Sequence, residues 1–226
     1  IITLNQSNNY RIIIFMKIEF YFDPSCPFCW VTSRWLLMFS AHREINIAWQ
    51  PFSLALKNNE LQQKPDEYQH ASVHRQSNRL LRVFFMASKL HDANLIDLYT
   101  SSGIKHHVAG FEFNDQHIKE VLSDNNLPED LLKYADDTSI DKDLGLNIKS
   151  ATDVAGQDIG VPTIIFENKL GEKQGFFGPV LQELPDLEEA LDLWDGLSKL
   201  ATNSSFYELK RSRPSGGPDV FSTAKC

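Results

Sequence analysis

Apolar and polar residues follow two different periods along this chain, and each period occupies its own segments. Residues 17–22 (KIEFYF) are apolar at nearly alternating positions and residues 45–49 repeat the pattern, as half-buried strands do. Between them, residues 27–40 carry an apolar helical face. Pro27 suits the first turn of a helix, because its missing N–H would have no partner there anyway. The opening of the chain therefore predicts a strand, a helix and a second strand, a βαβ unit.

The middle of the chain, residues 65–155, shows helical spacing and no strand pattern. Its clearest helix is marked by the apolar residues Val73, Leu80, Leu81, Phe84 and Phe85. Weaker helical segments follow at residues 95–104, 118–122, 131–134 and 141–155. This part of the chain predicts a helical layer inserted after the βαβ unit.

Strand patterns return in the last third of the chain. They cover residues 163–166 and 174–177, and a hairpin loop over residues 168–171 would join them. An amphipathic helix follows between Leu187 and Leu197. The polar segment after residue 203 is rich in proline and glycine, so we expect it to be extended or disordered.

These elements predict the α/β class and a thioredoxin fold with a helical insertion domain. The thioredoxin-fold domain would comprise residues 16–64 and 156–202, the insertion residues 65–155, and a C-terminal tail residues 203–226. Because Met16 opens the first strand pattern, we expect it to be the natural start, with residues 1–15 as upstream or disordered extension. A short N-terminal extension of its own is the alternative.

Charge and cysteine content narrow the class of function. The 226 residues carry a formal charge of −8, from 22 basic and 30 acidic residues, which argues against nucleic acid as a partner. No apolar run approaches the ~20 residues of a membrane span, and no signal-peptide pattern is evident. Of three cysteines, two share one short motif and Cys226 is the last residue, which favours a reducing, cytoplasmic setting over a disulfide framework.

The shared motif, Cys26-Pro27-Phe28-Cys29, falls where the first strand gives way to the helix. Helix N-terminal amides and the helix dipole stabilise a thiolate, and such sites commonly lower a cysteine pKa to ~3.5–7.5. We expect Cys26 to attack and Cys29, further into the helix, to resolve the mixed disulfide. One alternative is half a zinc site, but a second ligand cluster of the required spacing is missing from the sequence. The other is a pair of core cysteines without redox chemistry.

A second signal is the segment Gly160-Val161-Pro162-Thr163, just before the third strand. A proline is tolerated at the first residue of a strand, and this one could be cis. In thioredoxin folds such a loop faces the CxxC motif, so the N–H and C=O of Val161 would hydrogen-bond a substrate. An ordinary turn proline is the alternative.

Together these motifs resemble a known family. FYFDPSCPFCWVTSRWL, DLYT with the later His107, GVPTIIF, FFGPVL and FYELKR are similar to the mycothiol-dependent nitroreductases, a mycoredoxin-like group of DsbA-like thioredoxin-fold reductases. The likeness runs from Met16 to about Arg213. It implies a DsbA-like fold with Cys26 as the attacking cysteine, Cys29 as the resolving cysteine and Pro162 as the cis-proline.

The resemblance also implies a substrate pocket. Asn58 and Tyr68 match its polar residues, and His107 matches a histidine of the helical domain. From the residues alone, plainer interpretations are open. Asn58 could be a turn residue, Tyr68 could pack beside the helix, and His107 could be a solvated residue at a helix end. Phe28 stands where the family usually has tryptophan. It keeps a flat apolar surface beside the sulfur but loses the indole N–H donor.

The function we expect is that of a thiol–disulfide oxidoreductase acting on small disulfides or nitro compounds. A mycothiol-like low-molecular-weight thiol would serve as co-substrate, with no tightly bound cofactor and no metal; no Gly-rich dinucleotide fingerprint follows the first strand. One alternative is a glutathione-dependent isomerase or kappa-class transferase, although these typically have serine at the position of Cys26. A non-catalytic redox sensor and an exported oxidase remain open, since the fold alone sets no redox direction.

Overall fold

The structure is a computed structural model, and it describes residues 16–61, 70–168 and 171–225. Four expectations lie outside these residues: the nature of residues 1–15, the domain boundary between residues 64 and 65, the place of Tyr68, and the centre of the loop predicted over 168–171. The other expectations about the fold can be compared with the structure directly.

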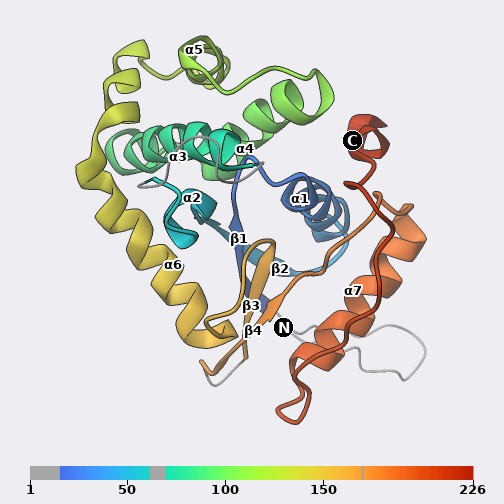
Figure 1. The fold of residues 1–226 in the computed structure, drawn as a ribbon. Helices are drawn as coiled ribbons and strands as arrows, with labels where there is room; N and C mark the ends of the chain where they lie inside the picture. The colour runs from blue at the N-terminus through green and yellow to red at the C-terminus, as the bar shows by residue number, and fades with distance from the viewer. Residues whose placement is uncertain (1–15, 62–69, 169–170, 226) are drawn as a thin grey trace.

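A four-stranded sheet forms the centre of the molecule (Figure 1). Its strands, in spatial order, are β2 (Ile45–Pro51), β1 (Met16–Phe22), β3 (Thr163–Glu167) and β4 (Lys173–Phe177). β1 runs parallel to β2 and antiparallel to β3, and β3 pairs antiparallel with β4. The predicted strands are therefore confirmed, and their order brings the segment before β3 beside the end of β1.

Two helices cover one face of this sheet (Figure 1). They are α1 (Pro27–Ser40) and α7 (Leu187–Ala201), which follow the predicted helices closely. Aromatic side chains join them, since Phe39 stacks on Trp194 at 4.5 Å between ring centroids and Trp194 stacks on Phe166 of β3 at 5.9 Å. Burial of these large rings fixes the position of α1 relative to the sheet.

The opposite face and the upper edge of the sheet carry the helices between β2 and β3 (Figure 1). They are α2 (Leu54–Lys57), α3 (Ala71–His91), α4 (Leu95–Gly103), the π-helix η1 (Ile104–Val108), α5 (Asp115–Asp124), the 3-10 helices η2 (Glu129–Asp136) and η3 (Thr138–Ile140), and α6 (Asp141–Ala155). Of these, α2 precedes the predicted insertion, and the others lie within it. The helical character predicted for this segment is confirmed. Two details differ, because the helix over 95–104 changes to π geometry after Gly103 and the segment around 131–134 is a 3-10 helix.

The C-terminal tail is more ordered than its composition predicts. Residues 203–219 contain no helix or strand, but the chain then forms a 3-10 helix, η4 (Val220–Lys225), against α1 and η1. Thr223 is buried there, and its Oγ1 accepts a 2.9 Å hydrogen bond from Trp30 Nε1. The expectation of an extended or disordered tail is wrong for residues 220–225, where a buried indole N–H needs a partner and the tail supplies one. We call residues 203–225 the C-terminal strap.

Candidate active site at the start of α1

The CPFC motif lies where β1 ends and α1 begins. After Phe22 the chain turns through Asp23, Pro24 and Ser25, and Cys26 is the N-cap residue of α1 with Pro27 in the first turn. The Cys26 sulfur accepts a 3.4 Å hydrogen bond from the backbone N–H of Cys29. This is the arrangement that the spacing predicts, with the first sulfur placed at the positive end of the helix dipole.

The two free thiols differ sharply in their surroundings. Cys26 is 9% exposed, whereas Cys29 is fully covered at 0%. The pKa of Cys26 is lowered, chiefly because the Cys29 side chain donates a hydrogen bond to its thiolate, with the Cys29 backbone N–H assisting against the effect of burial. Burial raises the pKa of Cys29 well above its usual range, and the neighbouring Cys26 adds to that rise. At neutral pH the first thiol is therefore the better nucleophile of the pair.

The loop before β3 faces this sulfur. The Val161–Pro162 peptide bond is cis, and the Cys26 thiol donates to the carbonyl oxygen of Val161 at 3.5 Å. The backbone N–H of Gly178 donates to the Pro162 carbonyl at 2.7 Å, which ties the loop to the end of β4. The cis-proline expectation is confirmed, and one of the two backbone groups predicted to meet a substrate is the group that contacts Cys26.

A buried carboxylate sits in the turn before the motif. Asp23 is fully buried and accepts four hydrogen bonds, from Ser25 N–H (2.9 Å), Ser25 Oγ (2.6 Å), Ser77 Oγ (2.5 Å) and Leu54 N–H (2.7 Å). These donors belong to the turn itself, to α2 and to α3. Asp23 therefore fastens the inserted helices to the CPFC turn, and its negative charge acts to raise the pKa of both thiols.

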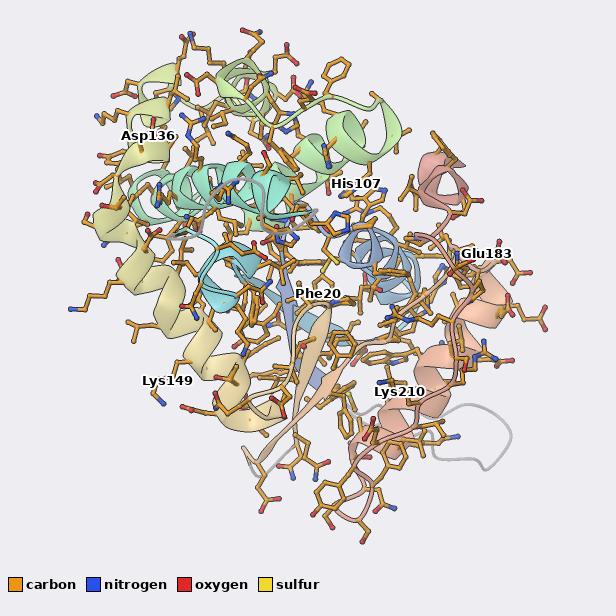
Figure 2. All side chains as sticks on the ribbon, viewed as in Figure 1. Phe20, His107, Asp136, Lys149, Glu183 and Lys210 are labelled. Carbon is orange, nitrogen blue, oxygen red and sulfur yellow. The ribbon has the colours of Figure 1, made fainter. Side chains whose placement is uncertain are left out.

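His107 contacts the same turn from the other side. Its Nε2 donates to the Pro24 carbonyl oxygen at 2.9 Å, and its ring stacks on Trp30 at 5.8 Å between centroids. Burial, with the nearby His106 as a smaller cause, lowers the pKa of His107 to about 3. The ring is thus neutral at physiological pH and acts as a donor. Figure 2 shows His107 on the side of the helical layer that faces α1.

Comparison with known proteins gives the family. Residues 25–211 match the family described as Rv2466c-like, mycothiol-dependent nitroreductase Rv2466c. The chain belongs to this family. It is therefore a thiol-dependent oxidoreductase, and its family's dependence on mycothiol makes a small thiol its co-substrate. The uncharacterized protein Rv2286c of Mycobacterium tuberculosis is 29% identical over 198 residues, covering 87% of this chain and 82% of the relative.

Solved structures agree on the DsbA-like fold. The cytosolic disulfide reductase DsbM from Pseudomonas aeruginosa superposes with a TM-score of 0.53 at 14% identity, covering 82% of this chain and 100% of that chain. DsbM with GSH gives 0.52 at 12% identity, with 81% and 99% covered. The oxidoreductase DsbA from Xylella fastidiosa gives 0.50 at 14% identity, with 81% and 84% covered. At these identities the likeness establishes the fold alone.

The other predicted site residues of this Rv2466c-like protein are less tightly gathered. Phe28, within the motif, is half-buried, and the guanidinium Cζ of Arg213 lies 5.1 Å from its ring centroid. Asn58 is exposed at the end of α2, and its side chain donates to Glu60 Oε1 at 3.0 Å. That contact fits the turn-residue interpretation, and the pocket roles of Asn58 and Tyr68 remain predictions.

Three contributors were not predicted from the sequence. Asp23 has no role in the expectations drawn from the sequence, although a carboxylate just before the CPFC motif, with a serine two positions on, is an available signal. Arg213 and Thr223 come from the strap, whose polar composition gave no sign of burial. Across residues 16–61, 70–168 and 171–225, no cluster of three or more His, Cys, Asp or Glu side chains is arranged to hold a metal ion.

A separate observation concerns membranes. Within the part of the chain that the structure describes, no helix combines the length and apolar character that crossing a bilayer requires.

Proposed function

We propose that Cys26 is the nucleophile and Cys29 the resolving thiol of a reductase that takes its electrons from a mycothiol-like small thiol. The observation that carries this proposal is the contrast between the two sulfurs. The Cys26 sulfur lies at the start of α1 with a lowered pKa, whereas Cys29 is buried with a raised one. A two-step exchange needs a thiolate that attacks the substrate first and a second thiol that stays protonated until the mixed disulfide has formed.

The steps balance as ordinary thiol–disulfide exchange. The Cys26 thiolate attacks a small disulfide, forms a mixed disulfide and releases one thiolate. Cys29 loses its proton and attacks the Cys26 sulfur, which forms the Cys26–Cys29 disulfide and releases the second thiolate. Two molecules of the small thiol then reduce the protein and leave as their own disulfide. For a nitro compound, the dithiol would give two electrons and two protons, which convert the nitro group to a nitroso group and water and leave the Cys26–Cys29 disulfide.

The surroundings of the motif favour small substrates over protein chains. The inserted helices lie against the CPFC turn through Asp23 and His107, and the strap lies against Phe28. We propose Phe28, Val161, Pro162, Asn58, Tyr68 and His107 as the residues that border the substrate. DsbM with GSH is a precedent for a small thiol on this fold, and a thiol reductant implies a reducing compartment such as the cytoplasm.

Two substitutions test the proposal. Cys26→Ser should abolish thiol-dependent reduction of a small disulfide and of a nitroaromatic probe, because the only low-pKa sulfur of the motif is gone. Cys29→Ser should instead stall after the first step and accumulate a mixed disulfide at Cys26, seen as an added mass in intact-protein mass spectrometry. Turnover that survives Cys26→Ser would refute the proposal.

A further inference from the structure

A pocket of about 330 Å³ lies beside the CPFC motif and is lined by Phe28, Arg213, Pro214 and Gly216. Its volume is at the lower end of the ~300–1,000 Å³ of small-molecule sites. One wall comes from the motif itself, and the other three residues come from the C-terminal strap. The pocket exists because the strap crosses the start of α1.

The strap is fixed on both sides of Arg213. Before it, Phe206 stacks on Phe176 of β4 at 5.8 Å between ring centroids. After it, Gln182 Nε2 donates to the Gly217 carbonyl at 2.8 Å, and the Asp219 N–H donates to the Gln182 carbonyl at 2.7 Å. The strap returns along α7 toward α1 (Figure 1). Arg213 is therefore held at the pocket by contacts that precede and follow it.

The guanidinium of Arg213 lies over the Phe28 ring, with Cζ 5.1 Å from the centroid. The ring attracts the positive charge without accepting a conventional hydrogen bond, so the N–H donors of the guanidinium are not used up by this contact. Among the described residues, no carboxylate lies within ion-pair distance of Arg213. In a chain with a formal charge of −8, Arg213 is thus a cation without an acidic partner among the described residues, in contact with Phe28 of the CPFC motif.

We propose that Arg213 and Phe28 form a subsite for the anionic group of a small aromatic disulfide or nitro substrate, with the aromatic body beside Phe28 and a carboxylate on the guanidinium. A carboxylate matches the fork of N–H donors and would bind it in bidentate fashion. The inference rests on the proposed function, because it deepens the description of the same site. Arg213 is a binding residue for the substrate and takes no part in the exchange of sulfur bonds.

The test compares two disulfides that differ in charge. Dithiobis(2-nitrobenzoate) carries two carboxylates, and 4,4′-dithiodipyridine carries none near neutral pH. Stopped flow would give the rate constant of each with the pre-reduced protein in a Cys226→Ser background, so that only the motif thiols react. We divide the rate constant for the dianionic disulfide by that for the neutral one. Any change in the reactivity of Cys26 itself affects both constants and cancels in this ratio.

We expect Arg213→Gln to lower this ratio about 10-fold, because it removes the charge-assisted hydrogen bonds to the carboxylate. Arg213→Lys should recover part of the loss through its charge. Arg211→Gln is the matched control, because it removes another exposed cation two positions away, and it should change the ratio less than about 2-fold.

An unchanged ratio in Arg213→Gln would overturn the subsite, and so would an equal loss in Arg211→Gln, which would indicate general attraction by the strap. These outcomes are distinct from failure of the proposed function. If Cys26→Ser still reacted with the neutral disulfide, the assignment of the nucleophile would fail, whatever the effect of Arg213.

Discussion

The sheet half and the inserted helical layer meet at the CPFC turn, and they contribute to it in different ways. The sheet half supplies the reactive geometry through backbone groups: the start of α1 at Cys26 and the Val161 carbonyl. The helical layer supplies side chains that hold the turn in place, namely Ser77 and His107. Reactivity in this molecule thus belongs to the motif, whereas rigidity belongs to its neighbours. The substitutions below separate the two contributions.

The largest effect should come from Gly103, at the end of α4. A Cβ added there would lie 2.2 Å from Trp30 Cζ3, and Trp30 is fully buried behind the motif. Gly103→Ala should therefore lower the free energy of unfolding by about 3 kcal/mol through overpacking. In Gly145→Ala, where nothing lies within 4 Å of the new Cβ, the same change within α6 should raise it by ~0.5–1 kcal/mol. Equal effects in denaturant titrations would contradict the close fit of the helical layer against Trp30.

The next largest effect should come from Asp23, and it should change both the free energy of unfolding and the pKa of Cys26. Asp23→Asn removes a charge from four hydrogen bonds and should cost about 2 kcal/mol in the free energy of unfolding. It should also lower the Cys26 pKa, because the carboxylate acts to raise it. Asp158→Asn, on an exposed residue, is the matched control for both readouts. A Cys26 pKa that rises in Asp23→Asn would show that positioning by Asp23 outweighs its charge.

The effect of His107 should appear in the pH dependence of folding stability at acidic pH. The unfolded chain protonates this histidine near pH 6.5, whereas the folded protein does so only at about pH 3. The contribution of His107 to the free energy of unfolding is therefore fully present above pH 6.5. It is lost as the pH falls from 6.5 toward about 3, because the unfolded state binds more protons in this range. His107→Gln should make the fall shallower, and His117, with its pKa lowered to about 4, should keep part of it. An identical pH profile of unfolding would contradict a neutral, buried His107.

The smallest effect should come from the strap. Thr223→Val removes the acceptor of the Trp30 indole N–H and should cost about 1 kcal/mol in unfolding free energy, since a buried donor is left without a partner. Thr223→Ser keeps the hydroxyl and serves as its control. If the Thr223→Val and Thr223→Ser variants melted at the same temperature, the hydrogen bond between Thr223 and Trp30 would contribute nothing to stability.

Much of the fold was readable from the sequence, because its signals are local. KIEFYF, Pro27 at the start of a helix and Pro162 before a strand each fix a conformation within a few residues, and each was predicted correctly. The contacts of Asp23 with Ser77 and of Trp30 with Thr223 join residues far apart in the chain. No periodicity encodes such pairs, because they depend on how the helical layer and the strap pack.

The measurement that bears most directly on the account is the ionisation of Cys26. In a Cys226→Ser background, the rate of alkylation at Cys26 can be followed against pH, with the modified residue located by peptide mass spectrometry. Because the pKa of Cys26 is lowered and that of Cys29 raised, we expect a midpoint below the ~8.5 of an ordinary thiol, with Cys29 unmodified over the same range. A midpoint at or above that value, or faster labelling of Cys29, would contradict it.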